Sequence, residues 1–241
     1  MAGRVLVTRP EPGASATAAR LKQAGYEAVL LPLSRTVALP VDLVAVYGPF
    51  DVVAVTSANA LSHAPRELID MLSRTRCLAV GARTAKAARD AGFAAVDNGP
   101  GDAAGLAQAI VAELPAGARI AYLAGRVRMP DFERHMREAG FALQAIETYD
   151  TERLQPSETA LRDLLENDAP DAVLLYSAKA AEAFAMLAHA HPRLAAGALL
   201  CLSPRVAASL QGLEGAHIFT AATPDEDALL ARLAAASPAV S

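Results

Sequence analysis

Hydroxyl-bearing and basic side chains gather in four short segments of the sequence. Each segment directly follows an apolar run and places Ser, Thr or Tyr close to Lys, Arg or Asn. The four segments are Thr56-Ser57-Ala58-Asn59, Gly81-Ala82-Arg83-Thr84, Tyr176-Ser177-Ala178-Lys179 and Ser203-Pro204-Arg205. Hydroxyl, amide and cationic groups donate hydrogen bonds, so the four segments together favour the binding of an anion.

Each of these segments is also expected to begin a helix. The first N–H groups of a helix have no partner within it, and the helix dipole attracts negative charge to that end. Such a start binds a carboxylate or a phosphate through its backbone. The alternative is ordinary N-capping, in which a Ser or Thr oxygen accepts a hydrogen bond from the helix itself. Four such starts in duplicated positions favour a site for a polyanion.

Other patterns of reactive residues are weaker. Arg126 and Arg128 follow Gly125 and form either an anion-binding edge or a solvated basic turn. The glycine fingerprints of dinucleotide and nucleoside triphosphate sites follow none of the predicted strands. The acidic run 225–227 is expected at a helix N-terminus, which favours acids. The five histidines form no triad, and we predict no metal site and no cofactor.

The composition describes a globular protein without an overall attraction for nucleic acid. The 241 residues are 53% hydrophobic and 20% charged, with a net charge of −4. Such a chain is expected to fold, and its field favours neither nucleic acid nor an acidic membrane surface. No apolar run approaches the ~20 residues of a membrane span. Cys77 and Cys201 lie in no disulfide or metal-binding pattern, so we expect a cytoplasmic protein. We also expect a monomer.

A repeat defines the elements that carry the hydroxyl-bearing segments. Four blocks recur in the same order, residues 3–36 at 117–151, 50–60 at 170–180, 78–85 at 200–207 and 100–102 at 223–225. The interval is 115 residues from Val5 to Ile120 and 120 residues from Ser57 to Ser177. Colinear matches of this kind indicate an internal duplication.

The blocks alternate strand-like apolar runs with helix-like stretches. This alternation predicts parallel sheets with helices on both faces. The expected fold class is therefore α/β, with two Rossmann-like or flavodoxin-like lobes. Segments 31–37 and 146–151 lie where one block type gives way to the next, and we expect them to cross between the lobes.

Several short pieces form an ordered pattern along almost the whole chain. It starts at residues 5–10 and ends at Thr223-Pro224. Between them lie Thr56-Ser57-Ala58-Asn59-Ala60, Gly81-Ala82-Arg83-Thr84-Ala85, Gly125-Arg126-Val127-Arg128, Tyr149-Asp150-Thr151 and Tyr176-Ser177. In this order the pieces resemble the uroporphyrinogen-III synthase family.

The resemblance implies both a fold and a reaction. The fold is two α/β lobes joined by a two-stranded β connection, with domains at residues 1–36 with 152–241 and at residues 37–151. The reaction is that of a cofactor-independent lyase of tetrapyrrole and haem biosynthesis. Its substrate, hydroxymethylbilane, is a small linear tetrapyrrole with many carboxylates. It loses its hydroxyl as water and closes to uroporphyrinogen III with the last pyrrole ring inverted.

The resemblance also assigns roles to particular residues. Tyr149 matches the tyrosine of a Tyr-x-Thr segment, the family's candidate for a weak general acid; the alternative is a structural tyrosine in a crossover strand. Thr84 matches a threonine of a Gly-x-x-Thr-Ala turn, whereas the later turn has Val206, whose side chain has no donor. The residues expected to bind the substrate are Arg9, Thr56, Ser57, Asn59, Gly81, Arg83, Thr84, Gly125, Arg126, Ser177, Ala178, Lys179 and Ser203.

Two other functions compete with this hypothesis. A non-catalytic two-lobed sensor of anions or tetrapyrroles would need the same donors. A nucleotide-dependent Rossmann enzyme would need the glycine fingerprint that is missing here. Turnover of hydroxymethylbilane, with analysis of the product isomers, distinguishes the enzyme from the sensor.

Overall fold

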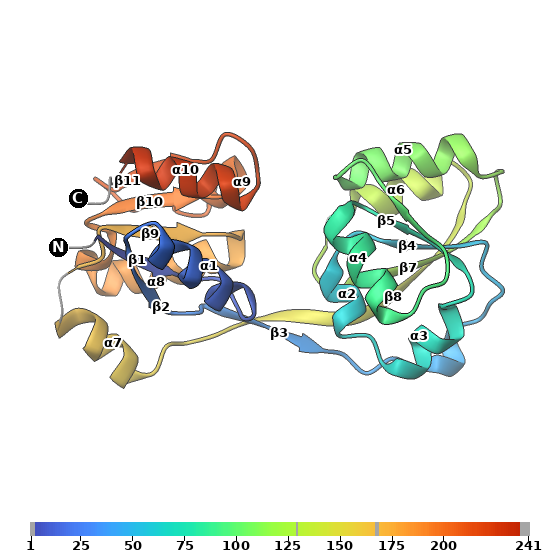
Figure 1. Ribbon diagram of the computed structural model, residues 1–241, viewed down its shortest axis with the longest axis horizontal. Helices are drawn as coiled ribbons and strands as arrows, with labels where there is room; N and C mark the ends of the chain where they lie inside the picture. Colours follow the sequence, from blue (N-terminus) through green and yellow to red (C-terminus); the bar gives the residue numbers. More distant parts are fainter. Residues whose placement is uncertain (1–2, 129, 167–168, 237–241) are drawn as a thin grey trace. The chain divides into compact units, whose positions relative to one another are not determined.

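The computed structural model describes residues 3–128, 130–166 and 169–236. The chain divides into two compact units. Unit 1 comprises the described residues of 1–35 and 152–241, and unit 2 comprises those of 36–151. Each unit is built on its own sheet with helices packed against it (Figure 1), so the predicted α/β class is confirmed.

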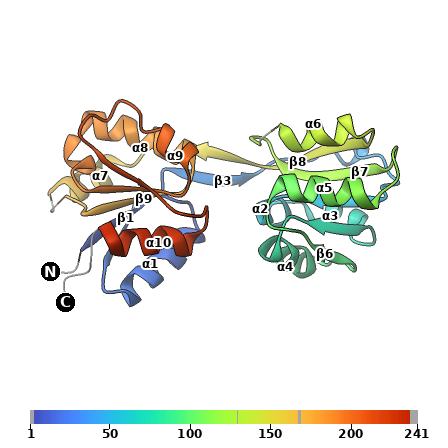
Figure 2. The same ribbon diagram turned by 90° about the horizontal axis from the view of Figure 1, so that it is seen from above.

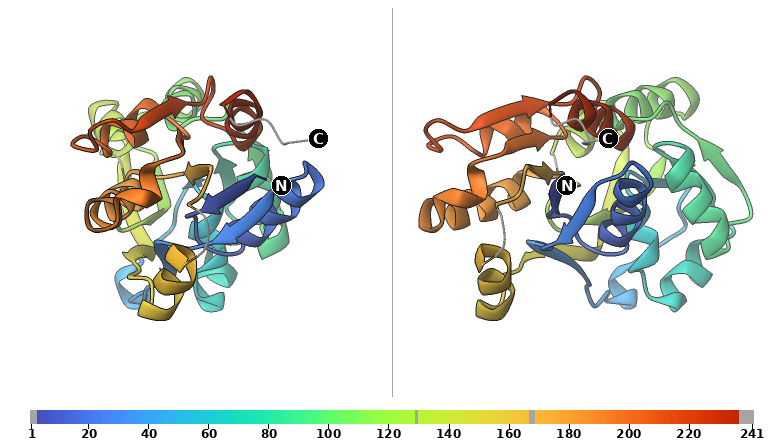
Figure 3. Two further views of the ribbon diagram at one scale, coloured as in Figure 1. Left: turned by 90° about the vertical axis from the view of Figure 1, so that its left-hand side faces the viewer. Right: turned by 60° about the vertical axis from the view of Figure 1, so that its left-hand side comes forward.

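The sheet of unit 1 joins strands from both parts of the chain that form this unit. Its five strands have the order β2-β1-β9-β10-β11, and every neighbouring pair is parallel. They are β1 (Arg4–Val7), β2 (Glu27–Leu30), β9 (Ala172–Leu175), β10 (Ala198–Cys201) and β11 (His217–Thr220). Figure 3 shows the early strands, in blue, beside the late strands, in orange. The buried Thr8 hydroxyl adds a bond between them, because it donates to the Leu174 carbonyl at 2.7 Å.

Helices cover both faces of this sheet. They are α1 (Gly13–Gln23), α7 (Glu158–Glu166), α8 (Ala178–Ala190), the short η2 (Pro192–Ala195), α9 (Pro204–Ala208) and α10 (Glu226–Ala236). Adjacent strand residues point to opposite faces. Val5 and Val7 therefore pack with α1 and α10, whereas Leu6 packs in the cluster that includes α7, α8 and α9. Figure 2 shows α1 and α10 on one side of the sheet and α8 and α9 on the other.

The sheet of unit 2 has six strands in the order β3-β8-β7-β4-β5-β6. They are β3 (Ser34–Ala38), β4 (Val52–Val55), β5 (Arg76–Ala79), β6 (Val96–Asn98), β7 (Arg119–Gly125) and β8 (Ala142–Arg153). The helices are η1 (Leu43–Ala45), α2 (Ala58–Ser62), α3 (Arg66–Leu72), α4 (Ala82–Ala91), α5 (Ala103–Glu113) and α6 (Asp131–Glu138). Helices α2, α3 and α4 pack on one face, and α5 and α6 pack on the other. Within the described ranges, no helix is both long and apolar enough to cross a membrane.

Five strands have the same spatial order in both sheets, as the repeat predicts, and β3 is an addition to the sheet of unit 2. The order β2-β1-β9-β10-β11 in unit 1 corresponds strand by strand to β8-β7-β4-β5-β6 in unit 2. The registers agree as well. Val5 pairs with Ala172, and the residues that correspond to them in the repeat, Ile120 and Val52, pair with each other. The duplication is therefore present in the strand pairing itself.

This topology creates a switch point in each sheet. Strands β1 and β9 are neighbours, as are β7 and β4, but the chain leaves the two members of each pair in opposite directions across the sheet. Ligands of open α/β sheets bind outside the carboxyl ends of the strands at such points. The fold therefore favours a site at these two places.

The chain passes from one unit to the other in β3 and in β8. These two strands are neighbours in the six-stranded sheet. The N–H of Leu39 donates to the Thr148 carbonyl at 2.9 Å, and the N–H of Leu154 donates to the Leu33 carbonyl at 3.0 Å. The segments predicted to cross, 31–37 and 146–151, overlap these two strands.

Thr148 fastens β8 to helix α2, and its removal should destabilise unit 2. The side chain is fully buried, and its hydroxyl donates to the Ala60 carbonyl at 2.7 Å. Thr148→Val keeps the shape but leaves this carbonyl without its donor. We expect the free energy of unfolding in urea to fall by about 1–3 kcal/mol. The same change at the exposed Thr159 of α7 should alter it by less than about 0.5 kcal/mol. Equal effects at the two positions would contradict this role of Thr148.

Candidate functional site

The predicted site residues of unit 2 lie together at one edge of its sheet. The edge is formed by the carboxyl ends of β4, β5 and β7 and by the adjoining part of β8. The residues are Thr56, Ser57 and Asn59 after β4, Gly81, Arg83 and Thr84 after β5, Gly125 and Arg126 at the end of β7, and Tyr149 in β8. The strand order brings them together because the strands pair in parallel.

A pocket of about 430 Å³ lies at this edge, against the start of α4. Its lining includes Thr56, Arg83 and Thr84. Helix α4 starts after Gly81, which has no side chain to cap it, so its first amide groups remain as donors. The Arg83 side chain is exposed and makes no ion pair or hydrogen bond with another described residue. Amide donors, hydroxyls and a cation are the groups that bind a carboxylate.

The lining of this pocket also includes an acid with a structural role. Asp102 lines the pocket, and its carboxylate accepts the N–H of Gly105 at 2.8 Å. It therefore serves as the N-cap of α5. The acid is engaged by its own helix rather than directed at a ligand.

Ser57 and Ser177 cap their own helices. The Ser57 oxygen accepts from the N–H of Asn59 at 3.3 Å, and the Ser177 oxygen accepts from the N–H of Ala180 at 3.2 Å. The capping alternative thus describes these two serines. Gly81 and Ser203 precede α4 and α9 without making a side-chain cap.

A β-bulge sets the position of Tyr149. The register between β7 and β8 shifts between Ala124 and Gly125, so that Gly125 pairs with Tyr149. Bulges re-aim side chains, often beside active sites. The Tyr149 ring lies directly against Gly125, where a Cβ would stand 2.6 Å from Cζ and 2.9 Å from the hydroxyl oxygen. The centre of the ring is 6.0 Å from that of His63.

The two arginines after β7 are engaged by acids. Arg128 donates to Glu147 at 2.9 Å and to Glu133, and it also donates to two carbonyl groups of its own turn. The hydrogen bond from Arg128 holds the pKa of Glu147 below its ordinary value. Arg126 is exposed and pairs with Glu147 at 3.3 Å and with Asp150 at 3.6 Å. Arg128 therefore braces the turn, while Arg126 lies on its outside.

The predicted residues of unit 1 lie at the carboxyl ends of three neighbouring strands. They are Arg9 after β1, Ser177, Ala178 and Lys179 after β9, and Ser203 after β10. Arg9 is paired with an internal acid, because its Nη1 donates to Oε1 of Glu226 at 3.1 Å. Its guanidinium also lies over the ring of Tyr176, 4.3 Å from the ring centre.

Glu226 is the centre of a polar cluster in unit 1. The hydroxyls of Thr17 and Tyr176 donate to its Oε1, the latter at 3.0 Å, and Arg20 lies 3.2 Å from its Oε2. Burial raises the pKa of Tyr176 to about 12, so the phenol keeps its proton at neutral pH. Burial opposes the ionisation of Glu226. The hydrogen bonds from Thr17 and Tyr176 and the charges of Arg9 and Arg20 outweigh this effect, and the Glu226 pKa lies below its ordinary value.

The described residues form no metal-binding cluster, and their cysteines are not placed for thiol chemistry. No three of their His, Cys, Asp or Glu side chains lie close enough together to hold a metal. Cys77 and Cys201 are buried and form no disulfide. Burial raises the pKa of each thiol to about 12, so neither is a thiolate at neutral pH.

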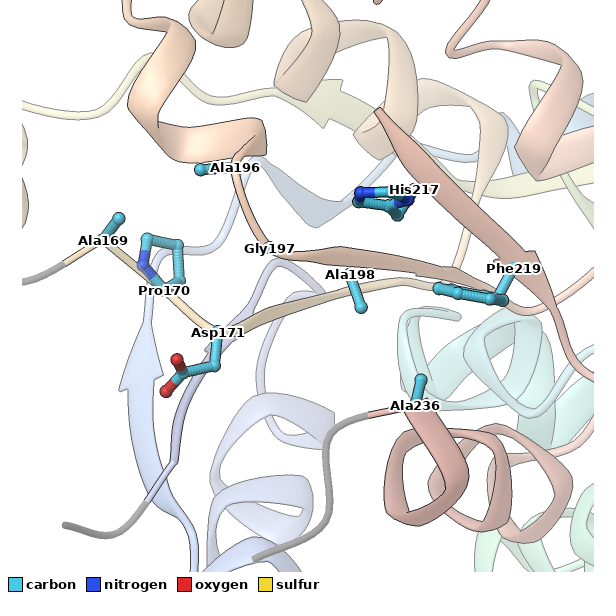
Figure 4. A pocket seen from close by; sticks show the side chains of 9 residues that line it. All are labelled: Ala169, Pro170, Asp171, Ala196, Gly197, Ala198, His217, Phe219 and Ala236. Atoms are coloured by element: carbon cyan, nitrogen blue, oxygen red, sulfur yellow. The ribbon is translucent and has the colours of Figure 1, made fainter. Parts of the chain in front are cut away.

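Another pocket lies at the opposite edge of the unit 1 sheet, beside the amino ends of β9, β10 and β11. Figure 4 shows this cavity of about 350 Å³ and the side chains around it. Its lining includes Asp171 and His217 but none of the predicted site residues. The Asp171 carboxylate accepts the backbone N–H of Arg4 at 2.7 Å. The acid thus secures the start of a strand, and the pocket lies away from the edge where ligands of such sheets bind.

Comparison with known proteins decides the family. The sequence model of the family described as uroporphyrinogen-III synthase HemD matches residues 15–231. The chain belongs to the uroporphyrinogen-III synthase family. No curated protein sequence matches it.

Two solved uroporphyrinogen-III synthases have a similar fold. The uroporphyrinogen-III synthetase from Helicobacter pylori is 19% identical with a TM-score of 0.65, and the match covers 98% of this chain and 99% of that chain. A mutant enzyme from the extreme thermophile Thermus thermophilus is 20% identical with a TM-score of 0.59, and the match covers 98% of each chain. At these identities the likeness supports the fold.

Three residues at these edges of this uroporphyrinogen-III synthase family member were not predicted from the sequence. Thr17 and Glu226 hold Arg9 in unit 1, and the Tyr122 hydroxyl lies 2.8 Å from that of Thr56 in unit 2. The signal for Tyr122 in the sequence is a phenol in a strand whose other residues after Arg119 are small or aliphatic. Glu226 was expected only as an acid in the first turn of a helix, where it does lie.

Acidic pH should lower the stability of unit 1, because it protonates Glu226. Because the folded-state pKa of this carboxyl is lowered, its contribution to stability is present above the ordinary value of 4.5 and is lost as the pH falls below it. We expect the Tm of wild type to fall steeply below that pH and the Tm of Glu226→Gln to fall less. Thr17→Val, which removes one donor but keeps the carboxylate, should give an intermediate slope. Thermal unfolding followed by circular dichroism across this pH range tests the prediction, and identical slopes for wild type and Glu226→Gln would refute it.

Proposed function

We propose that this chain closes hydroxymethylbilane into uroporphyrinogen III at the carboxyl edges of its two sheets. The family match over residues 15–231 carries the proposal. The family consists of cofactor-independent lyases of tetrapyrrole and haem biosynthesis. The electron-rich pyrroles of the substrate expel its hydroxyl themselves, so the protein's task is to bind, orient and protonate.

In unit 2 the pocket beside α4 takes a carboxylate of the substrate. Its amide donors at Gly81, its hydroxyls at Thr56 and Thr84 and the cation of Arg83 converge on one lining. Ser57 and Asn59 begin α2 next to Thr56. Holding a flexible chain in one reactive geometry contributes several kcal/mol to catalysis.

In unit 1 the starts of α8 and α9 take further carboxylates. Ser177, Ala178 and Lys179 form the first, and Ser203 precedes the second. Arg9 also faces this edge, where a substrate carboxylate competes with Glu226 for its guanidinium. Arg126 in unit 2 is placed in the same way, since a ligand competes with Glu147 and Asp150 for it.

Tyr149 is the proposed general acid. The bilane hydroxyl leaves as water, and a nearby phenol stabilises the charge that develops on the departing oxygen. Tyr149 is half-buried at the edge that carries the pocket residues, and Gly125 makes room for its ring.

The proposal extends to the organisation of the protein. The domains are residues 1–36 with 152–241 and residues 37–151, and the enzyme is a cytoplasmic monomer that does not bind nucleic acid. Two observations support the lack of nucleic-acid binding and the cytoplasmic location. The net charge is −4, and both cysteines are free, as is usual in a reducing compartment.

Isomer analysis tests the proposed function. The purified protein is mixed with enzymatically generated hydroxymethylbilane, and the products are oxidised to porphyrins and separated. We expect the type III isomer at a rate above the spontaneous formation of the uninverted type I isomer. Formation of type I alone, together with tight binding of a tetrapyrrole, would support the non-catalytic sensor instead.

Removal of the Tyr149 hydroxyl should slow turnover without abolishing binding. General acid assistance is worth about 10²-fold or more. Because this substrate ionises readily, we expect Tyr149→Phe to lower kcat by about 10²-fold. Product affinity should be retained, and more type I isomer should form from released substrate. Tyr47→Phe, at a tyrosine 66% exposed, is the matched control and should behave as wild type. A Tyr149→Phe variant with wild-type kcat would make Tyr149 a packing residue.

A methyl group at position 125 should disturb the same tyrosine. In Gly125→Ala the new Cβ would overlap the Tyr149 ring, so the ring must move. A misplacement of about 1 Å can cost on the order of 10²-fold in rate, and we expect a loss of that size in kcat. Combined with Tyr149→Phe, the change should cost little more, because the displaced hydroxyl is already gone. Additive losses in steady-state assays would show that Gly125 acts through another group.

A further inference from the structure

Tyr122 is a buried phenol beside the pocket of unit 2. It lies on β7, is 2% exposed, and its ring packs against Phe132 of α6 with the ring centres 4.7 Å apart. Its hydroxyl reaches the carboxyl end of the neighbouring strand β4, where it lies 2.8 Å from Oγ1 of Thr56. This contact spans the β7/β4 switch point, and Thr56 lines the pocket.

The direction of this hydrogen bond follows from what surrounds it. Burial raises the pKa of Tyr122, so the phenol carries its proton at neutral pH. Among the described residues, Thr56 is the hydrogen-bond partner of this phenol. If Thr56 donated, the buried phenol proton would lack an acceptor, which costs about 1–3 kcal/mol. This cost favours Tyr122 as the donor and Thr56 as the acceptor.

This direction leaves the proton of Thr56 for another acceptor. A threonine hydroxyl has one proton and two acceptor positions, and Tyr122 occupies one of the acceptor positions. A fixed oxygen also fixes the rotamer of the threonine, which would otherwise choose among its staggered positions. The Thr56 proton is thus directed away from Tyr122, on a residue that lines the pocket.

We propose that Tyr122 is a positioning residue that holds Thr56 so that its hydroxyl donates to a carboxylate of the tetrapyrrole. The inference rests on the proposed function, and it explains how the Thr56 hydroxyl in the lining of the binding pocket is oriented. Tyr122 itself is buried behind Thr56 and acts through it. The effect therefore belongs to binding, in KM and product affinity, rather than to kcat.

A double-mutant cycle between Tyr122 and Thr56 tests this inference. The variants are Tyr122→Phe, Thr56→Val and the double variant, and the probe is uroporphyrinogen III under anaerobic conditions, with KM and kcat for the bilane measured in parallel. Each single change should weaken product binding and raise KM about fivefold, the value of one neutral hydrogen bond, while kcat changes less than about twofold. The double variant should bind no more weakly than either single variant.

Two further variants distinguish an effect on ligand binding from a general loss of stability. Tyr26→Phe removes another largely buried phenol, in unit 1, and should leave the affinity unchanged. Thr56→Ser keeps the hydroxyl and should bind close to wild type. If Tyr122→Phe does not fold, the two Thr56 variants can still overturn the inference. A Thr56→Val variant that binds the product as tightly as Thr56→Ser and wild type would show that the Thr56 hydroxyl does not donate to it.

The outcomes separate this inference from the proposed function. A wild-type protein that neither binds the product nor turns over the bilane overturns both. A functional wild type with additive losses in the cycle, or with a Tyr122→Phe effect confined to kcat, overturns the role of Tyr122 alone. A coupled loss confined to KM and affinity supports it.

Discussion

The pairing of β1 with β9, and of β4 with β7, is the constraint on which both edges depend. Each pair joins segments that are far apart in the chain, and the strands are buried on both faces. The hydroxyl-bearing turns come together because these strands run parallel, so that their carboxyl ends lie at one edge of each sheet. The buried Thr8 hydroxyl strengthens the first pair through the Leu174 carbonyl. In the second pair, Tyr122 and Thr56 form a similar side-chain bridge at the point where β4 ends.

Several cations at the two edges are paired with internal acids, although a polycarboxylate is the proposed ligand. Arg9 is held by Glu226, and Arg126 and Arg128 share Glu147. An unpaired cation in a half-buried position, such as that of Arg9 or Arg128, is costly, and an internal acid offsets part of that cost. Affinity for the ligand then depends on amide and hydroxyl donors and on exchange of carboxylate partners. Such an arrangement suits an enzyme that must release a product with the same carboxylates as its substrate.

The sequence was sufficient for most of what depends on periodicity and repetition. The repeat predicted two similar lobes with parallel sheets, and the segments 56–59 and 81–84 do begin helices at strand ends. Contacts between elements were not predictable, because they depend on register and on side-chain length. The bulge at Gly125 shifts Tyr149 by local geometry that no composition reveals. The partners of Arg9 and Thr56 come from α10 and β7, and only the packed structure shows which side chains reach them.

The divided unit has a consequence for synthesis on the ribosome. Residues 36–151 form a continuous stretch that contains all of unit 2, whereas unit 1 needs residues from both sides of it. The first apolar strand, β1, is made early but pairs with β9, which is made much later. Domains generally fold as units during translation, so unit 2 is complete while β1 still waits for its partner. The nascent chain therefore carries β1 paired at most with β2, with the edge that β9 later occupies still open, during much of its elongation.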